Sequence, residues 1–408
     1  MKKWRIIIGI VTAIAAVGFF VLPKIIDKTM QTMQGGGERC SSEPDEWMPV
    51  RGECPGATLE METKCNEFCD KHPDCCGERG ENAGNFGRRE TILPLPADGV
   101  ISALKRSYPK TIKALNEGPN IYFREAKAEI ISDEKLEEIK AIGFNTIQVL
   151  LIGKKENNKL IFNESNNSVL LNDIVAIKKH GLAVWVALDI AGAPASAQSA
   201  GLGNYENFKV SFLDFAKNAA ELLEKYKVEY FTANNEPDKP FKEQKNWNAE
   251  EINNNLADFF PAVNAVAREK FNGKLINKIT KTQNHVKKVI DASFKNVDIA
   301  GVDVGPPLDG RMNLKYYKIE LDEYQSYASL AEKAGVLWMN AEYWMGDFEG
   351  EFYDFAKNNE LECAKISFDA YLKTIPKGAG YVWNDVRTFS LPQGEETKKA
   401  LKNFLDKI

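Results

Sequence analysis

The sequence predicts an α/β protein whose main domain is a (β/α)8 TIM barrel, preceded by an N-terminal transmembrane helix and a small disulfide-rich module. First, short β-branched runs alternate with longer amphipathic stretches from about residue 94 onward, as expected of repeated β-α units with a parallel sheet. Second, eight such units fit into roughly 290 residues, the size of this barrel. Third, the first expected strand is followed by no glycine-rich phosphate turn of the kind typical of a nucleotide-binding doubly wound sheet, which is the alternative fold.

The composition is that of a folded protein with a large core. The chain has 408 residues, of which 44% are hydrophobic and 27% charged. Its formal net charge of −5 provides no overall attraction for a polyanion, so nucleic acid is not an expected partner. The three histidines are too far apart in sequence to form a common zinc motif.

The N-terminus carries an uncharged apolar run, Ile6 to Leu22, with Lys2, Lys3 and Arg5 before it. This run is long enough to span a thin bilayer, so residues 1–24 are predicted to be a transmembrane signal anchor, followed by a linker over 25–39. The basic residues predict a cytoplasmic N-terminus and a single-pass cell-membrane protein with its remaining domains extracellular. Secretion after cleavage of a signal peptide is the alternative.

A cysteine-rich module with its linker is predicted over 40–90. In an exported segment, six closely spaced cysteines indicate three disulfides, whose connectivity the sequence leaves open. A zinc site that includes His72 is the alternative, although the spacings match no common ligand pattern well. Cys363 stands in a predicted helix, where it is expected to be a small buried apolar residue. The six cysteines are Cys40, Cys54, Cys65, Cys69, Cys75 and Cys76.

The elements are assigned from β-branched runs for strands and amphipathic stretches for helices. Residues 91–118 are expected to be a helical lead-in, with a helix over 98–116, and residues 119–408 to be the barrel. Strands are expected over 120–125, 145–152, 183–190, 228–234, 274–280, 297–304, 335–341 and 380–384. Helices are expected over 133–142, 170–180, 206–226, 249–270, 284–293, 320–334, 352–373 and 395–407.

Two glutamates end expected strands that lie on different sides of such a barrel. Strand four ends in Asn235-Glu236-Pro237, and strand seven leads into Glu342. Active sites of these barrels lie at the carboxyl ends of the strands. Two carboxyl groups that face each other there suit glycosidic cleavage, since one protonates the leaving oxygen while the other attacks the anomeric carbon or activates water.

On these residues the barrel region resembles glycoside hydrolase clan A, the retaining β-glycosidases. The resemblance implies that Glu236 is the acid/base, Glu342 the nucleophile and Asn235 a ligand of the sugar 2-hydroxyl. It implies a carbohydrate substrate and no metal or organic cofactor in catalysis. Repulsion by an ionised Glu342 is expected to raise the pKa of Glu236. A helix-start carboxylate and a solvated loop charge are the structural alternatives for the two glutamates.

Other strand ends offer candidate substrate-binding groups. Trp383 is expected as an aromatic floor under the sugar, Arg124 as a partner of Glu342, and Trp247 and Trp344 as outer platforms. Each has packing or an ordinary ion pair as its alternative. Asp189 and Asp303 are expected to bind sugar hydroxyls or to cap loops.

The chain departs from the usual clan pattern at two strand ends. It has no arginine after strand two and no histidine or tyrosine directly after strand six, so Tyr316, Tyr317 and Tyr343 are candidates for the missing hydroxyl. The uncharged segment 191–203 is expected to be a lip over the cleft or a surface loop.

Two other functions are open to the same barrel. One is a non-catalytic carbohydrate-binding or surface adhesion protein, which would not require both glutamates. The other is an aldolase-like enzyme with Lys278 as a Schiff-base lysine, although nothing in the sequence around it indicates a lowered pKa.

Overall fold

The computed structural model divides the chain into two compact units, Met1–Gly87 and Arg88–Ile408. It describes parts of the second unit only, which are residues 93–118, 129–152, 154–156, 159–161, 167–189, 204–242, 244, 247–280, 285–304, 314, 320–343, 351–384, 391–392 and 394–408. The predicted anchor and the six clustered cysteines lie outside these residues and stay predictions. Within the described ranges, no helix combines the length and the apolar character needed to cross a bilayer.

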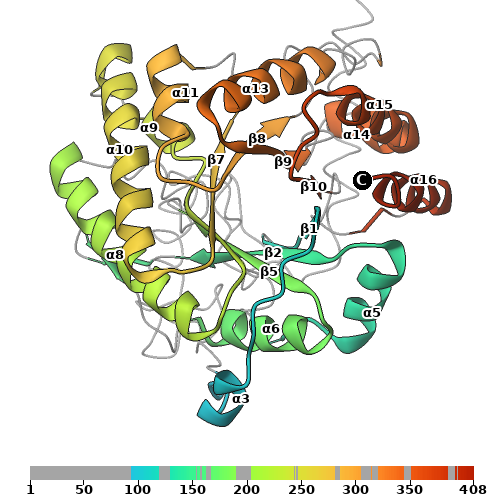
Figure 1. Ribbon diagram of the computed structural model, residues 1–408, viewed down its shortest axis with the longest axis horizontal. Coiled ribbons are helices and arrows are strands. Elements are labelled where there is room, and N and C mark those ends of the chain that lie inside the picture. The colour runs from blue at the N-terminus through green and yellow to red at the C-terminus, as the bar shows by residue number, and fades with distance from the viewer. Residues whose placement is uncertain are drawn as a thin grey trace, which may run out of the picture. The chain divides into compact units, whose positions relative to one another are not determined.

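Eight parallel strands close into a barrel in the order β1-β10-β9-β8-β7-β6-β5-β2 (Figure 1). The predicted barrel architecture is therefore confirmed. A separate antiparallel hairpin consists of β3 (Lys154–Glu156) and β4 (Lys159–Ile161). The barrel strands are β1 (Ile112–Asn116), β2 (Thr146–Ile152), β5 (Ala183–Asp189), β6 (Tyr230–Asn235), β7 (Lys274–Ile279), β8 (Ile299–Val304), β9 (Leu337–Tyr343) and β10 (Gly380–Trp383).

The first strand is the main correction to the predicted elements. Barrel closure is made by β1, Ile112–Asn116, which pairs with both β10 and β2, so the barrel begins before residue 119. The expected lead-in helix is limited to α3, Asp98–Ser102, and the expected strand over 120–125 lies outside the described residues. The run Ile-Lys-Ala-Leu-Asn lacks strong strand propensity, and its place between two strands overrides that weak local preference.

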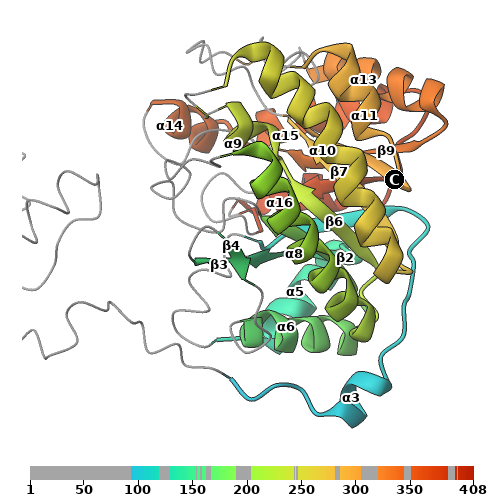
Figure 2. The same cartoon turned by 90° about the vertical axis from the view of Figure 1, so that its left-hand side faces the viewer.

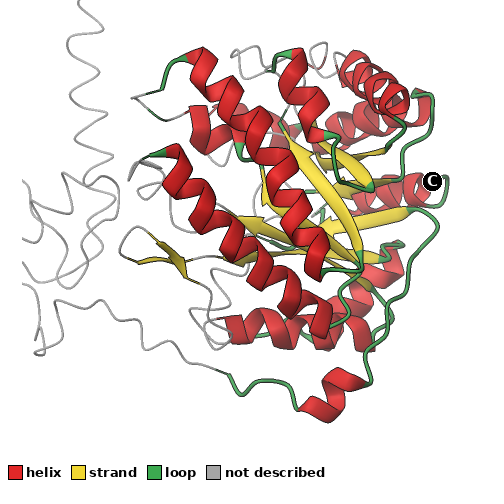
Figure 3. Cartoon of the chain, turned by 60° about the vertical axis from the view of Figure 1, so that its left-hand side comes forward, coloured by secondary structure: helices red, strands yellow, loops and turns green. Residues whose placement is uncertain are grey.

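Except for α9, which was not expected, the helices around the barrel match their expected ranges closely, and they cover the outside of the strands (Figure 3). The expected helix over 352–373 is split into two at Asn359. In Figure 2, α8 and α10 lie side by side. The helices around the barrel are α5 (Asp133–Ile142), α6 (Ser168–Lys179), α8 (Tyr205–Lys225), α9 (Asp238–Lys242), α10 (Ala249–Lys270), α11 (Lys287–Ser293), α13 (Glu320–Ala334), α14 (Glu351–Asn358), α15 (Glu360–Lys373) and α16 (Glu395–Leu405).

Local sequence explains where several helices begin. The side chain of Ser132 accepts a hydrogen bond from the backbone of Lys135 and caps α5. Asn248 and Glu251 form a reciprocal capping box at the start of α10. Such caps satisfy backbone donors that a helix leaves free, so these boundaries follow from a few neighbouring residues.

The apolar core has two layers. The larger layer lies between strands and helices, and a smaller cluster fills the inside of the barrel. Because side chains alternate along a strand, residues two positions beyond an inner one also point inward. Ile276 is an inner residue, so Lys278 points inward nearer the carboxyl end of the same strand. The inner cluster is Ile112, Ala114, Ala183, Trp185, Tyr230, Ile276, Ile299, Met339, Ala341 and Val382.

Candidate active site

Irregular strand pairing brings Glu342 to the inside of the barrel. Along β8 and β9, Val302 pairs with Asn340 but Asp303 pairs with Glu342, so β9 has one extra residue. Ala341 is an inner residue, and strict alternation would turn Glu342 toward the helices. The bulge shifts the alternation by one and lets Glu342 face the same space as Asp303.

A second bulge lies on β6, just before Glu236. Four steps from Phe231 to Asn235 match three steps from Leu275 to Lys278 on β7. Glu236 itself has a φ of +44°, in the left-handed region that residues with a side chain rarely adopt, and it precedes a proline, which favours extended backbone. Strain of this kind persists where the surroundings impose it and is concentrated at functional sites.

Asp238 anchors the turn that follows Glu236. Its carboxylate is buried, accepts a hydrogen bond from the Thr280 hydroxyl, and lies 3.4 Å from His285 Nε2 and 3.4 Å from Lys242 Nζ. Burial would raise the pKa of Asp238, but the contacts with His285 and Thr280 outweigh it and lower that pKa. The ionised Asp238 therefore ties the start of α9 to the residue that follows β7.

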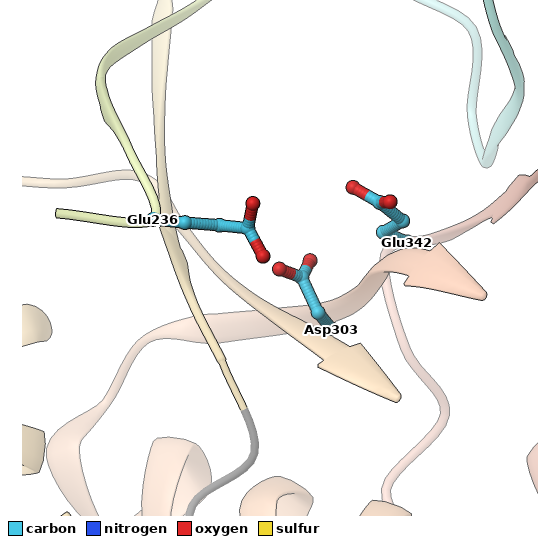
Figure 4. Close-up of side chains that lie close together, drawn as sticks. All are labelled: Glu236, Asp303 and Glu342. Atoms are coloured by element: carbon cyan, nitrogen blue, oxygen red, sulfur yellow. The ribbon is translucent and has the colours of Figure 1, made fainter. Parts of the chain in front are cut away.

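Three carboxyl groups meet at the carboxyl ends of the strands. One carboxylate oxygen from each of Glu236, Asp303 and Glu342 lies within 4.8 Å of the others. Figure 4 shows Asp303 between the two glutamates, with Glu236 extended toward it on one side and Glu342 on the other. The two predicted catalytic glutamates and one predicted sugar-binding residue therefore occupy a single site.

Two lysines balance the charge of these acids. Lys278 is only 2% exposed, and its ammonium pairs with Glu342 Oε2 and lies 3.5 Å from Asp303 Oδ1. Lys239 lies one helical turn after Glu236, and its Nζ is 2.6 Å from Glu236 Oε1. Burial would lower the pKa of Lys278, but the carboxylates of Asp303, Glu342 and Glu236 raise it above its ordinary value. Lys278 is therefore a cation, which disfavours the Schiff-base hypothesis.

The expected pKa of Glu236 is wrong in direction. Burial alone would raise it, but Lys239, Lys278 and a hydrogen bond with Asp303 outweigh burial, so the pKa of Glu236 lies below its ordinary value. Burial raises the pKa of Asp303 well above its usual range, because the attraction of Lys278 does not offset burial and the negative charge of Glu236. The prediction considered only repulsion between the glutamates and could not include lysines that the fold brings close.

Of the other predicted residues, two end strands at the site and several lie outside the described part of the chain. Asn235 ends β6 beside the site, with its Oδ1 buried and unpartnered among the described residues. Asp189 ends β5 and pairs with Asn235 through the backbone, and its side chain lies outside the described part of the chain. Arg124, Trp344, Tyr316, Tyr317 and the segment 191–203 also lie outside it.

Packing corrects two of the aromatic predictions, Trp383 and Tyr343, whereas the platform role of Trp247 stays a prediction. Trp383 is fully buried, and its ring packs against Phe368 of α15 at 5.8 Å, so it belongs to the helix-facing core and not to a sugar floor. Its inner neighbour Val382 takes the barrel-facing position. The Tyr343 hydroxyl donates to the carbonyl of Cys363 on α15 and so points away from Glu342. Trp247 is half-buried, with edge contacts to Tyr205 and Phe241.

Sequence reasoning missed the pairing roles of Lys278 and Lys239. The signal for Lys239 was its spacing of three residues from Glu236 at a helix start. The signal for Lys278 was its inward register relative to Ile276. Cys363 is buried in α15, as expected.

The fold has solved counterparts, although neither a protein-family model nor a curated protein matches the sequence. A GH113 β-1,4-mannanase superposes with a TM-score of 0.51 at 14% identity, over 74% of this chain and 100% of that one. A GH5-4 broad-specificity endoglucanase from Clostridium longisporum gives 0.52 at 11% identity, over 77% and 100%. A glycoside hydrolase family 5 enzyme from Prevotella bryantii B14 gives 0.51 at 12%, over 77% and 99%. The resemblance to clan A is thereby confirmed for the fold, which is the eight-stranded barrel that these glycoside hydrolases share.

Proposed function

We propose that this chain is a retaining glycoside hydrolase that cleaves β-glycosidic bonds of an oligosaccharide or polysaccharide. The observation that carries the proposal is the placement of Glu236 and Glu342 at the ends of β6 and β9, with carboxylate oxygens within 4.8 Å of each other. Retaining enzymes have carboxyl groups about 5 to 5.5 Å apart, whereas inverting enzymes leave room for a water at about 6.5 to 9.5 Å. We assign retention from the resemblance to clan A, and the anomer that forms first tests it.

In the first half-reaction, an oxygen of Glu342 forms a bond to the anomeric carbon. The bond from that carbon to the leaving oxygen breaks, and its electron pair passes to the oxygen, which takes a proton from Glu236. The Lys278 ammonium holds the Glu342 carboxylate in place before attack. As the ester forms, Lys278 loses that charge partner and keeps Asp303 and Glu236 as counter-ions.

In the second half-reaction, Glu236 acts as the base. It takes a proton from water, the water oxygen attacks the anomeric carbon, and the ester bond returns its electrons to Glu342. The buried and unpartnered Oδ1 of Asn235 is placed to accept a hydrogen bond from a substrate hydroxyl at this end of β6. Both steps together retain the anomeric configuration.

The structural neighbours guide the choice of substrates. Their names include a β-1,4-mannanase and a broad-specificity endoglucanase, so β-mannans and β-glucans are the first polysaccharides to test. Aryl β-mannosides and β-glucosides extend the panel to single sugars with an activated leaving group.

The deciding experiment compares the wild-type protein with Glu342→Gln on this panel, with product configuration followed by proton NMR. We expect hydrolysis with the β-anomer formed first, and no turnover in Glu342→Gln. Glu221→Gln, a change at an exposed glutamate of α8, is the control and should behave as wild type. Glycan binding without hydrolysis in the wild type would instead support the non-catalytic carbohydrate-binding protein, and an initial α-anomer would support inversion.

A further inference from the structure

Asp303 is the carboxyl group that the two-glutamate mechanism does not use. It is 9% exposed and lies between Glu236 and Glu342. Neither of its carboxylate oxygens accepts a hydrogen bond from a described residue, and its ion pair with Lys278 is long, at 3.5 Å from Nζ to Oδ1. A buried ionised carboxylate that accepts no hydrogen bond is costly, whereas a protonated one carries its own donor. Two ionised carboxylates cannot hydrogen-bond to each other, but an acid and a carboxylate can.

We propose that Asp303 and Glu236 share a single proton and that Asp303 holds it in the resting protein, as the store from which Glu236 receives the proton for the leaving group. This inference rests on the proposed glycosidase function and adds a third carboxyl group to it. Asp303 acts through Glu236 and is therefore a positioning residue for the acid proton.

The charges around Asp303 fit this assignment. Lys278 on β7, Glu236 at the end of β6, Glu342 on β9 and Lys239 on α9 all act on the site electrostatically. On the helix side of β8, the Tyr327 hydroxyl donates to the Gly301 carbonyl and stays neutral, because burial raises its pKa well above the usual range. A raised pKa for Asp303 and a lowered one for Glu236 both place the proton on Asp303.

The charge of the site then stays constant through the first half-reaction. At rest, Glu342 and the Glu236–Asp303 pair each carry one negative charge, which the ammonium groups of Lys278 and Lys239 balance. When Glu342 becomes a neutral ester, the pair has lost its proton and carries two negative charges. The same two lysines balance that state, so no uncompensated charge is created in a partly buried site.

The proton path is short and balanced. The Asp303 O–H bond breaks as its proton passes to a Glu236 oxygen, and Glu236 delivers a proton to the leaving oxygen as the glycosidic bond breaks. The leaving group departs as a neutral alcohol, and both carboxyl groups are left ionised. In the second half-reaction, the proton that Glu236 takes from water restores the shared proton to the pair.

Asp303→Asn tests this with little change of shape or resting charge. The asparagine amide can donate a hydrogen bond to Glu236 as a protonated Asp303 does, but it cannot release a proton. We expect the activity on an unactivated β-glycan to fall by about 100-fold or more, the scale of lost general-acid assistance. A 2,4-dinitrophenyl β-glycoside needs little protonation of its leaving group, so its loss should be at least tenfold smaller. The basic limb of the pH profile on the glycan should move to lower pH, because Glu236 alone must then hold the proton.

Asp291→Asn, on the exposed face of α11, is the matched control and should leave rates and pH profile unchanged. Equal losses on the glycan and the dinitrophenyl glycoside would show that Asp303 only supports the geometry, and would overturn the inference. An unshifted basic limb would overturn it as well.

Carbon-13 NMR of labelled aspartate separates this inference from the proposed function. The Asp303 carboxyl signal, identified by its loss in Asp303→Asn, should be that of the protonated acid at about pH 6, well above the ordinary aspartate range. This result stands even if no glycoside is hydrolysed, in which case only the proposed function fails. A signal that titrates near pH 4 refutes the shared proton whatever the activity shows.

Discussion

The two ends of the barrel hold buried charges in different ways. At the amino-terminal end, a floor cluster of Glu229, Lys178, Arg106 and Glu224 is fully paired. Glu229 is 1% exposed and accepts hydrogen bonds from the backbone of Ser107 and Val184, each at 2.9 Å, and from Lys178 Nζ at 2.5 Å. Arg106 pairs with Glu224 and donates to the Val228 carbonyl at 2.7 Å.

The mouth cluster, which consists of Glu236, Asp303, Glu342 and Lys278, is different. Polar atoms that make no hydrogen bond to a described residue gather toward this end, including Oδ1 of Asn235 and both oxygens of Asp303, of which Oδ1 lies 3.5 Å from Lys278 Nζ. Glu236 also has a strained backbone. Native proteins normally satisfy buried polar groups, and their exceptions are concentrated at functional sites. The difference indicates that the floor charges stabilise the barrel, and it supports the proposal that the mouth charges act on a substrate.

The largest effect on this comparison is expected from removing the proposed acid/base, Glu236. Glu236→Ala is expected to lower kcat on unactivated glycans by about 10²- to 10⁴-fold, since the general acid is lost. On a dinitrophenyl glycoside, azide should restore turnover and give the β-glycosyl azide, because azide needs no general base. The azide product is identified by proton NMR.

Glu342→Ala separates the two roles. An α-azide from Glu342→Ala, together with the β-azide from Glu236→Ala, would support the assigned roles. The reverse pairing of products would exchange acid/base and nucleophile.

A substitution in the floor cluster should lower the stability of the protein and leave its activity unchanged. Glu229→Gln leaves the buried Lys178 without its counter-ion, so we expect the free energy of unfolding to fall by about 3–5 kcal/mol. Urea denaturation measures this, with Glu221→Gln on the exposed face of α8 as the control. The activity of the remaining folded protein should be unchanged. A large loss of activity with normal stability would remove the distinction between floor and mouth.

The comparison also explains what the sequence could predict. Helices depend on local periodicity and caps, so the expected ranges 133–142 and 249–270 coincide with α5 and α10. Glu236 and Glu342 were identifiable because each ends a recognisable strand. The first strand was missed because its five residues resemble the sequence of a helix more than that of a strand.

The arrangement within the mouth depends on features that are not local. A one-residue bulge in β9 decides that Glu342 meets Asp303, and the register of β7 decides that Lys278 joins them. The same one-residue alternation turns Trp383 toward Phe368, opposite to the prediction. Such choices are made by pairing between distant segments, so a single sequence specifies the candidate residues more readily than their partners.

Thr280, which helps to hold the turn after Glu236, should give an effect of intermediate size when it is changed. Thr280→Val removes the hydroxyl that donates to the buried Asp238 carboxylate, and hydrogen bonds to charged groups contribute about 1.5–3 kcal/mol. We expect a stability loss of this size in urea denaturation and a loss in kcat with little change in KM, because Glu236 would be less well fixed. Thr280→Ser keeps the hydroxyl and should restore both quantities. An unchanged kcat in Thr280→Val would show that the strained turn is held by other contacts.

The smallest effect concerns the pH dependence of stability at the mouth. A carboxyl group whose pKa is raised in the folded protein binds its proton there more tightly than in the unfolded chain, and Asp303 is such a group. Its contribution to stability is complete below the unfolded pKa, near 3.9, and is lost as the pH rises toward the folded value. The loss amounts to at most about 1.4 kcal/mol per pH unit in that window. The asparagine side chain in Asp303→Asn does not titrate, so that variant lacks this loss of stability.

The stability of Asp303→Asn relative to wild type should therefore increase between about pH 5 and pH 7, as measured by urea denaturation at several pH values. Glu236 has a lowered pKa, so its contribution to stability is lost as the pH falls, in a range below that of Asp303. Glu224→Gln at the floor is the matched substitution for a carboxyl group with a lowered pKa. Its partners Arg106, Asn272 and Lys227 outweigh burial and lower the pKa of Glu224 to about 2. Its cost should be present at pH 7 and diminish as the pH falls toward that value. If both variants showed the same slope with pH, the proton would not reside on Asp303, and the mouth would be paired in the same way as the floor.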